Sequence, residues 1–159
     1  MRIAATMASD GQLMTSWGAR SHFNIQEFLC KCGVCVYNRV DQNLVDHLET
    51  IRLQLAKPIT VVSGIRCPKH NEKAGGAEHS QHLPDASGIS GAADLYASGI
   101  SSAKLFMLAM MNQVPGRGIG ATKVHIDSRE NPASWMYGDH KGKKPEEWVT
   151  SLIEDAFKE

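Results

Sequence analysis

The chain has 159 residues, of which 42% are hydrophobic and 21% are charged. This length and composition predict one globular domain spanning residues 1–159, with enough chain to bury a core. Its 17 Lys and Arg balance its 17 Asp and Glu, so the formal net charge is zero, which argues against a nucleic-acid partner. No apolar run approaches the roughly 20 residues of a membrane span.

The N-terminal segment shows no sustained hydrophobic period. We expect residues 1–22 to form an arm on the domain surface, with a short strand over 1–7. Residues 24–29 then predict one helical turn, with Asn24 as its N-cap.

Three helices are predicted further along the chain. The first covers 41–56, where Asp41 can cap the start. The second covers 101–112, and a closing helix covers 145–158 after a polar loop over 129–144. The first is the clearest, because its apolar stripe recurs at helical spacing: Leu44, Leu48, Ile51 and Leu55.

Strands are predicted where β-branched and apolar residues form short runs. They cover 58–64 and 92–97, and the stretch 116–128 reads as two paired strands or one bent strand. Residues 71–77 read as a loop. Since strand neighbours are close in sequence and helices flank them, we expect an α+β fold with a small antiparallel sheet.

Four cysteines are unevenly spaced, with three inside six residues: Cys30, Cys32, Cys35 and Cys67. Two disulfides would use all four thiols. Alternatively, the thiols and the Cys-x-x-His that ends at His70 could hold a structural metal. Either arrangement would tie the segment near residue 32 to the segment near residue 67.

Two imidazoles and one carboxylate stand out as candidate metal ligands. His82 lies in a glycine-punctuated loop, whereas Asp94 and His125 lie in apolar strands. Polar groups in such strands carry a desolvation cost unless they are paired or bound to a metal. A catalytic zinc ion takes three protein ligands and keeps a fourth position for water. Strand alternation also turns Asp127 to the same face as His125.

These residues fall in motifs that resemble a known family. Ser-Gln-His at 80–82, Ala-Ala-Asp at 92–94 and His-Ile-Asp-Ser-Arg at 125–129 are similar to the zinc D-Ala-D-Ala carboxypeptidase and endolysin family, whose relatives include van-type dipeptidases and the hedgehog domain. Matching pieces upstream lie at 23–28 and 63–66. The resemblance covers about residues 23–135, leaving the arm at 1–22 and a C-terminal loop and helix at 136–159.

The resemblance implies a fold, a cofactor and a reaction. It implies a hedgehog-like or D-Ala-D-Ala peptidase-like fold in which His82, Asp94 and His125 bind zinc. Arg66 would bind substrate and stabilise the developing oxyanion, and Ser80 would hydrogen-bond the substrate backbone. The implied activity is hydrolysis of peptidoglycan stem peptides, as a D,D-carboxypeptidase or an endopeptidase.

The spacing of the first ligand departs from the family. From His82 to Asp94 the chain advances 94 − 82 = 12 positions, more than family members keep, so residues 83–89 carry an insertion. The insertion could reshape the substrate cleft, or His79 could replace His82 as the ligand.

The second departure concerns the general base. Many relatives carry an acidic residue three positions before the second histidine, and this chain has Thr122 there. Asp127 is the substitute that we expect to accept the proton, unless it serves outside the ligand shell by fixing Arg129. Glu78 and Asp85 are weaker candidates.

Two other functions compete with the peptidase. A zinc-stabilised module that binds cell-wall peptide or packs in a phage particle without cleaving is favoured by Thr122 and by the insertion. A nucleic-acid binder that uses the cysteines as a finger is disfavoured by the neutral charge. We expect a monomer that is made in the cytoplasm without a secretory signal and acts at the cell wall or periplasm, with phage- or prophage-type delivery.

Overall fold

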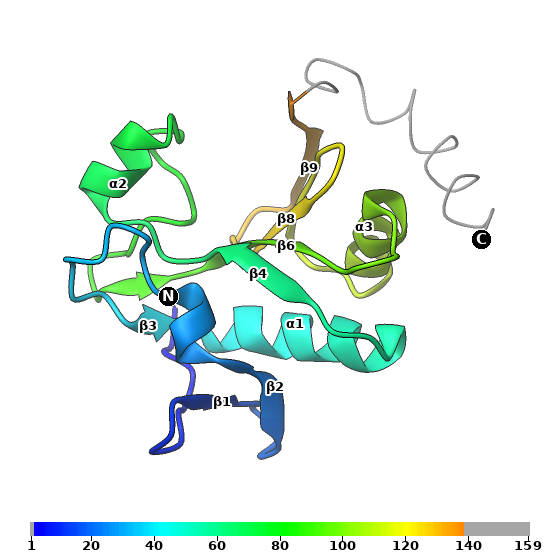
Figure 1. Ribbon diagram of the computed structural model, residues 1–159, viewed down its shortest axis with the longest axis horizontal. Helices are drawn as coiled ribbons and strands as arrows, with labels where there is room; N and C mark the ends of the chain where they lie inside the picture. Colours follow the sequence, from blue (N-terminus) through cyan, green and yellow to red (C-terminus); the bar gives the residue numbers. More distant parts are fainter. Residues whose placement is uncertain (1, 139–159) are drawn as a thin grey trace.

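The computed structural model describes residues 2–138, so the predicted helix over 145–158 lies outside the described residues. Figure 1 shows the arrangement of the elements. The helical elements are η1 (Ile25–Phe28), α1 (Gln42–Leu55), α2 (Pro68–Lys73) and α3 (Ser102–Met111). The strands are β1 (Gln12–Met14), β2 (Arg20–Asn24), β3 (Arg39–Val40), β4 (Thr60–Ser63), β5 (Ile89–Ser90), β6 (Ala92–Tyr96), β7 (Gly116–Ile119), β8 (Val124–Asp127) and β9 (Ala133–Met136).

A five-stranded sheet in the order β4-β6-β8-β7-β9 forms the centre of the fold. Its first three pairings are antiparallel, and β9 joins β7 in parallel. Two smaller sheets, β1 with β2 and β3 with β5, lie outside it. The α+β prediction is therefore confirmed, with two parallel pairings that the sequence did not predict, β7 with β9 and β3 with β5.

The two faces of this sheet differ in character. On β6 and β8, Leu95, Val124 and Ile126 belong to the buried core together with apolar residues of α1 and α3. The residues that alternate with them, Asp94 and His125, point to the opposite face. One face thus builds the core, and the other is free to carry polar chemistry.

Helix α1 confirms its prediction within one residue at each end. Its N-cap is Asp41, but that carboxylate accepts from the backbone N–H of Ile3 rather than from its own helix. The helix ends at Leu55, and its C-cap residue Ala56 adopts a left-handed conformation with φ of 55°. The predicted turn after Asn24 is also confirmed, as the one-turn helix η1 closed by a capping box with Glu27.

The N-terminal arm differs from its prediction. Residues 2–7, the described part of the predicted strand, form no strand and make only single bridges, at Ala4 and Met7. The regular pairing is instead between β1 and β2, in the second half of the arm. A segment forms a strand only when another segment pairs with it. In the arm the paired segments are β1 and β2, which show no apolar period that the sequence analysis could detect.

Two further elements replace predicted loops. Helix α2 begins before the predicted loop over 71–77 and continues into it. Pro68 starts this helix, and the sulfur of Cys67 accepts from the backbone N–H of His70 at 3.4 Å, so a thiol serves as the cap. Strand β9 lies inside the predicted loop over 129–144 and depends on its pairing with β7.

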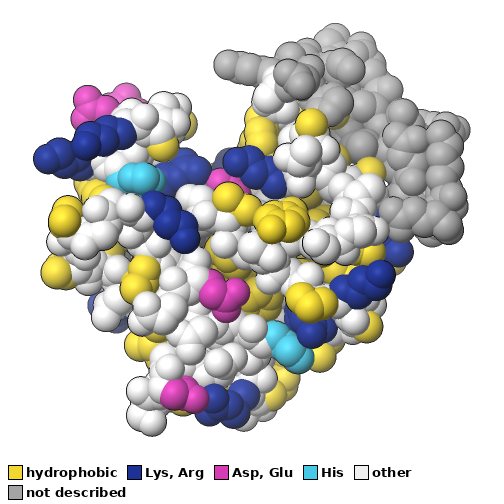
Figure 2. Space-filling model, in the orientation of Figure 1, with side chains coloured by type: hydrophobic (Ala, Val, Ile, Leu, Met, Phe, Trp, Pro, Cys, Tyr) yellow, Lys and Arg dark blue, Asp and Glu magenta, His cyan; other side chains and the backbone are white. Residues whose placement is uncertain are grey.

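None of the helices among residues 2–138 is long and apolar enough to cross a membrane. Basic and acidic side chains are scattered over the face drawn in Figure 2, with no continuous basic stripe on it. This distribution agrees with the formal net charge of zero.

The segment after β4 lies between two other parts of the chain. The backbone N–H of Ile65 donates to the carbonyl of Phe28 at 2.8 Å, and that of Arg66 donates to the carbonyl of His82 at 3.0 Å. This close approach requires a glycine, because a Cβ on Gly64 would lie 2.8 Å from the Cα of Phe28. The segment therefore connects the one-turn helix to the loop that carries His82.

We expect Gly64→Ala to destabilise the protein by about 1–3 kcal/mol, because the added methyl group meets backbone that has no flexible end to move away. Urea denaturation gives the free energy of unfolding. The exposed Val62→Ala on the same strand is the control, with an expected loss of about 0.5 kcal/mol or less. Equal stability of the two variants would contradict this account of Gly64.

Candidate metal centre

The three predicted ligands meet at one point on the polar face of the sheet. One ligand atom from each of His82, Asp94 and His125 lies within 4.8 Å of the others. His82 and Asp94 are only 3% and 7% exposed, so the groups are largely withdrawn from water. Residues from a loop and from two different strands therefore converge, although they are far apart along the chain.

Strand register brings two of these ligands together. Asp94 on β6 is directly opposite His125 on β8, and Ser63 on β4 is directly opposite Asp94. The same transverse row continues through Gly118 on β7 to Trp135 on β9. Directly opposed residues have Cβ atoms about 5 Å apart, which is a suitable separation for two ligands of one ion.

A hydrogen bond outside the centre orients each imidazole. The Nδ1 of His82 lies 2.7 Å from the carbonyl oxygen of Gly64, which can only accept, so Nδ1 carries the proton and Nε2 faces Asp94. His125 is held the other way round, with Nε2 2.7 Å from Asp127 and Nδ1 3.0 Å from Asp94. Such outer hydrogen bonds fix the orientation and tautomer of metal-bound histidines.

The charges at the centre favour an anionic aspartate. Burial alone would raise the pKa of Asp94, but hydrogen bonds from His125 and His82 hold that pKa well below its usual range. Arg66 adds a guanidinium N–H that donates to Oδ2 of Asp94 at 3.0 Å. Two imidazoles and an ionised carboxylate form the donor set that catalytic zinc sites use, so these residues fit zinc.

Asp127 lies on the far side of His125 from Asp94 and is fully buried. One oxygen contacts Nε2 of His125, and both accept hydrogen bonds from the guanidinium of Arg129 at 2.7 and 2.8 Å. Burial opposes the charge, but Arg129 and His125 hold the pKa of Asp127 below its usual range. In this geometry Asp127 is suited to orient His125, which is the alternative to the role of proton acceptor.

Two glycines of β7 make room for these groups. A Cβ on Gly116 would meet the carboxylate of Asp127, and one on Gly118 would meet the indole of Trp135. The Trp135 ring consequently reaches His125, with ring centroids 5.1 Å apart, and Arg129 lies 4.7 Å above its centroid. Sequence reasoning missed Trp135 as a site residue, although the spacing of Gly116 and Gly118 marked a close approach of another chain segment.

The insertion over 83–89 does not remove His82 from the centre. It folds on itself, because Asp85 accepts from the backbone N–H groups of Ser87 and Ile89. The chain then returns, and Gly91 donates to the carbonyl of Gln81 at 3.1 Å. His79 is exposed and does not belong to the ligand group that the structure brings together.

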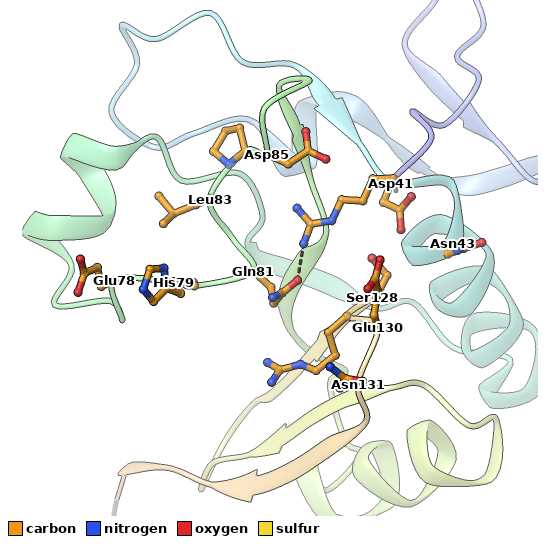
Figure 3. A pocket seen from close by; sticks show the side chains of 14 residues that line it. Asp41, Asn43, Glu78, His79, Gln81, Leu83, Asp85, Ser128, Glu130 and Asn131 are labelled. Atoms are coloured by element: carbon orange, nitrogen blue, oxygen red, sulfur yellow. Dashed lines mark hydrogen bonds between the residues drawn. The ribbon is translucent and has the colours of Figure 1, made fainter.

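A cavity of about 910 Å³ is lined by Ser80 and Arg129, which contact His82 and Asp127, whereas the three ligands themselves do not line it. Figure 3 shows Glu78, His79 and Leu83 on one side of it and Ser128 and Asn131 on the other. The predicted substrate residue Ser80 also lines it, and its Oγ accepts from the backbone N–H of His82 at 3.2 Å. Its volume suits a small-molecule or short peptide ligand.

The N-terminal arm contributes to this cavity as well. Arg2 lines it and donates to the side chain of Gln81 and to the carbonyl of Ile89, which anchors the arm to the inserted loop. Of the weaker candidates for the general base, Glu78 and Asp85 both line the cavity. Thr122, which replaces the acidic residue of many relatives, is exposed in the turn between β7 and β8.

We expect His82→Ala to lower the zinc content of the purified protein by about one ion per chain, because it removes one of three ligands. Metal analysis by mass spectrometry measures this content. His79→Ala removes a nearby imidazole outside the ligand group and should leave the content unchanged. Loss of zinc in the His79 variant alone would show that the wrong histidine had been assigned.

The comparisons with known proteins agree with this geometry. No curated protein matches the chain significantly. The sequence model of one family, described as Peptidase M15, matches residues 21–127, which include His82, Asp94, His125 and Asp127. That is the family of zinc D-Ala-D-Ala carboxypeptidases, and its members are zinc-dependent. The chain therefore belongs to the M15 family of zinc peptidases.

Proposed function

We propose that the protein hydrolyses peptide bonds in the stem peptides of peptidoglycan, as a zinc-dependent D,D-carboxypeptidase or endopeptidase. The observation that carries the proposal is the ligand group of His82, Asp94 and His125 in a chain of the M15 family. The implied substrate sets the place of action at the cell wall or periplasm.

Zinc, when bound by the three ligands, supplies a Lewis acid that polarises a peptide carbonyl and lowers the pKa of water towards about 7. The residues around it prepare the site. The carbonyl of Gly64 and the carboxylate of Asp127 hold the two imidazoles in the orientation that an ion needs. Because these bonds exist before substrate arrives, no reorganisation is required at the moment of reaction.

Arg66 is suited to act on the substrate carbonyl. Its guanidinium is tied to Ser63 at 3.1 Å and to Asp94 at 3.0 Å, so it is held at the edge of the ligand group. Its side chain remains 17% exposed, which leaves donors that can face a ligand. A fixed cation at this position stabilises negative charge that develops on the carbonyl oxygen.

Ser80 and the inserted loop are suited to hold the peptide. Ser80 lines the cavity two residues before His82, where its hydroxyl group can exchange hydrogen bonds with a substrate backbone. Leu83 and Pro84 add apolar surface from the inserted loop. The insertion therefore lengthens one wall of the cleft and leaves the ligands in position.

A second candidate is a zinc-stabilised module that binds cell-wall peptide without cleaving it. The observation that favours it is the engagement of Asp127 by both His125 and Arg129, together with the exposed Thr122 in place of the acidic residue of many relatives. The first candidate cleaves the peptide and the second only binds it, and both require the metal.

Removal of the metal tests the catalytic proposal. We expect EDTA to abolish release of amino groups from purified peptidoglycan, and added zinc to restore it, because the reaction needs a Lewis acid. Asp94→Ala should be inactive with or without added zinc. Peptide binding by the zinc-loaded wild type without any release of amino groups would instead favour the non-catalytic module.

The role of Asp127 is tested by Asp127→Asn. If this carboxylate orients His125, zinc affinity in a competition titration should fall about 10- to 100-fold, because an outer hydrogen-bond partner of a ligand is weakened. Asp85→Asn makes the same chemical change in the cavity wall and should not alter zinc affinity. Abolished hydrolysis with unchanged zinc affinity would identify Asp127 as the proton acceptor.

A further inference from the structure

The sulfurs of the four cysteines come together beside the segment that follows β4. Each of the sulfurs of Cys30, Cys32, Cys35 and Cys67 lies within 4.8 Å of the other three. Figure 1 shows the loop between η1 and β3 lying near the start of α2, where Cys67 is the N-cap residue. His70, the alternative fourth ligand, does not belong to this group among the described residues.

The spacing of the sulfurs fits one tetrahedral ion. Four thiolates at about 2.3 Å from a zinc ion lie about 3.8 Å from one another. The sulfurs of Cys32 and Cys67, which come from different segments, are 3.9 Å apart. Because all four gather in one group instead of two separate pairs, a shared ion explains the arrangement better than two disulfides.

Backbone N–H groups already point at the sulfurs. Cys32 accepts from the N–H groups of Val34 and Cys35 at 3.5 and 3.3 Å. Cys30 accepts from the N–H of Cys67 at 3.5 Å, and Cys67 accepts from that of His70 at 3.4 Å. Hydrogen bonds of this kind stabilise the thiolate form, which is the form that ligates a metal.

The loop that supplies three of the cysteines has little else to hold it. Residues 30–38 contain no helix or strand, and Val34 and Val36 are 86% and 90% exposed. The only side chains of this loop that turn inward are those of the three cysteines and Tyr37. Apolar burial therefore does not fix the loop, and the sulfur cluster takes that role.

We propose that Cys30, Cys32, Cys35 and Cys67 bind a structural zinc ion, separate from the ion of the His82 centre. With four protein ligands the site is closed, as structural zinc sites are, so the ion does not act on substrate. Binding releases the thiol protons and joins the loop at 30–38 to the start of α2. The proposal does not depend on the peptidase activity.

The consequence for the other centre follows from the chain between them. Cys67 directly follows Arg66, and the N–H groups of Ile65, Arg66 and Cys67 are bonded to Phe28, His82 and Cys30. A metal on Cys67 thus fixes one end of the segment 65–67. This segment contains Arg66, whose backbone N–H is bonded to the carbonyl of His82. The cysteine site would act as a positioning device for the substrate arginine.

Zinc counting in three full-length proteins tests the proposal. We expect two zinc ions per chain in the wild type, one in Asp94→Ala and one in the double variant Cys32→Ser/Cys35→Ser. If the His82 centre binds no zinc, the wild type and Asp94→Ala would each hold one ion, and the cysteine proposal would still stand. Absence of zinc from Asp94→Ala would overturn it.

Two measurements on Asp94→Ala, which retains all four thiols, keep the test decisive if the cysteine variant fails to fold. Replacement of zinc by cobalt should give strong thiolate-to-cobalt charge-transfer absorption in the near ultraviolet. Intact mass after purification without reductant should show four free thiols. A mass lower by two hydrogens for each of two disulfides, with no cobalt absorption, would show that the cysteines pair covalently and would overturn the proposal.

Discussion

The antiparallel register between β6 and β8 is the constraint on which the site depends. It places Asp94 directly opposite His125, and a shift of either strand by one residue would turn its ligand into the apolar core. The core prevents that shift, because Leu95, Val124 and Ile126 on the other face are packed against the two long helices. Burial of apolar residues on one face thus specifies the geometry of polar residues on the opposite face.

Outer contacts convert this register into a defined metal centre. Each imidazole has one nitrogen engaged by a fixed acceptor, the carbonyl of Gly64 or the carboxylate of Asp127. Arg129 neutralises Asp127, and Trp135 covers the far side of His125. The positions that support the ligands therefore come from β8, β9 and the segment after β4, and two glycines of β7 leave room for the side chains of Asp127 and Trp135.

The sequence predicted the parts of this protein that carry a local signal. The apolar stripe of α1 has a period of its own, and His125 lies between two apolar residues where an unpaired imidazole would be costly. Strand alternation also indicated that Asp127 shares the face of His125. The alternative role predicted for Asp127, fixing Arg129, agrees with the hydrogen bonds from that guanidinium to both of its oxygens.

The missed elements depend on distant parts of the chain. Strand β9, with the sequence Ala-Ser-Trp-Met, has weak strand propensity and exists through its pairing with β7. Helix α2 is only six residues long, without an apolar stripe, and is anchored at Cys67. Neither element can be predicted from a short stretch of sequence, since each depends on the segment that lies beside it.

The self-contained turn around Asp85 has an evolutionary consequence. Because the side-chain bonds of Asp85 close within the inserted loop and the chain rejoins at Gln81 and Gly91, the number of residues between the first histidine and the aspartate is decoupled from the distance between their side chains. The length of this loop can therefore change while the three ligand side chains keep their positions. A search that demands fixed ligand spacing would overlook such chains.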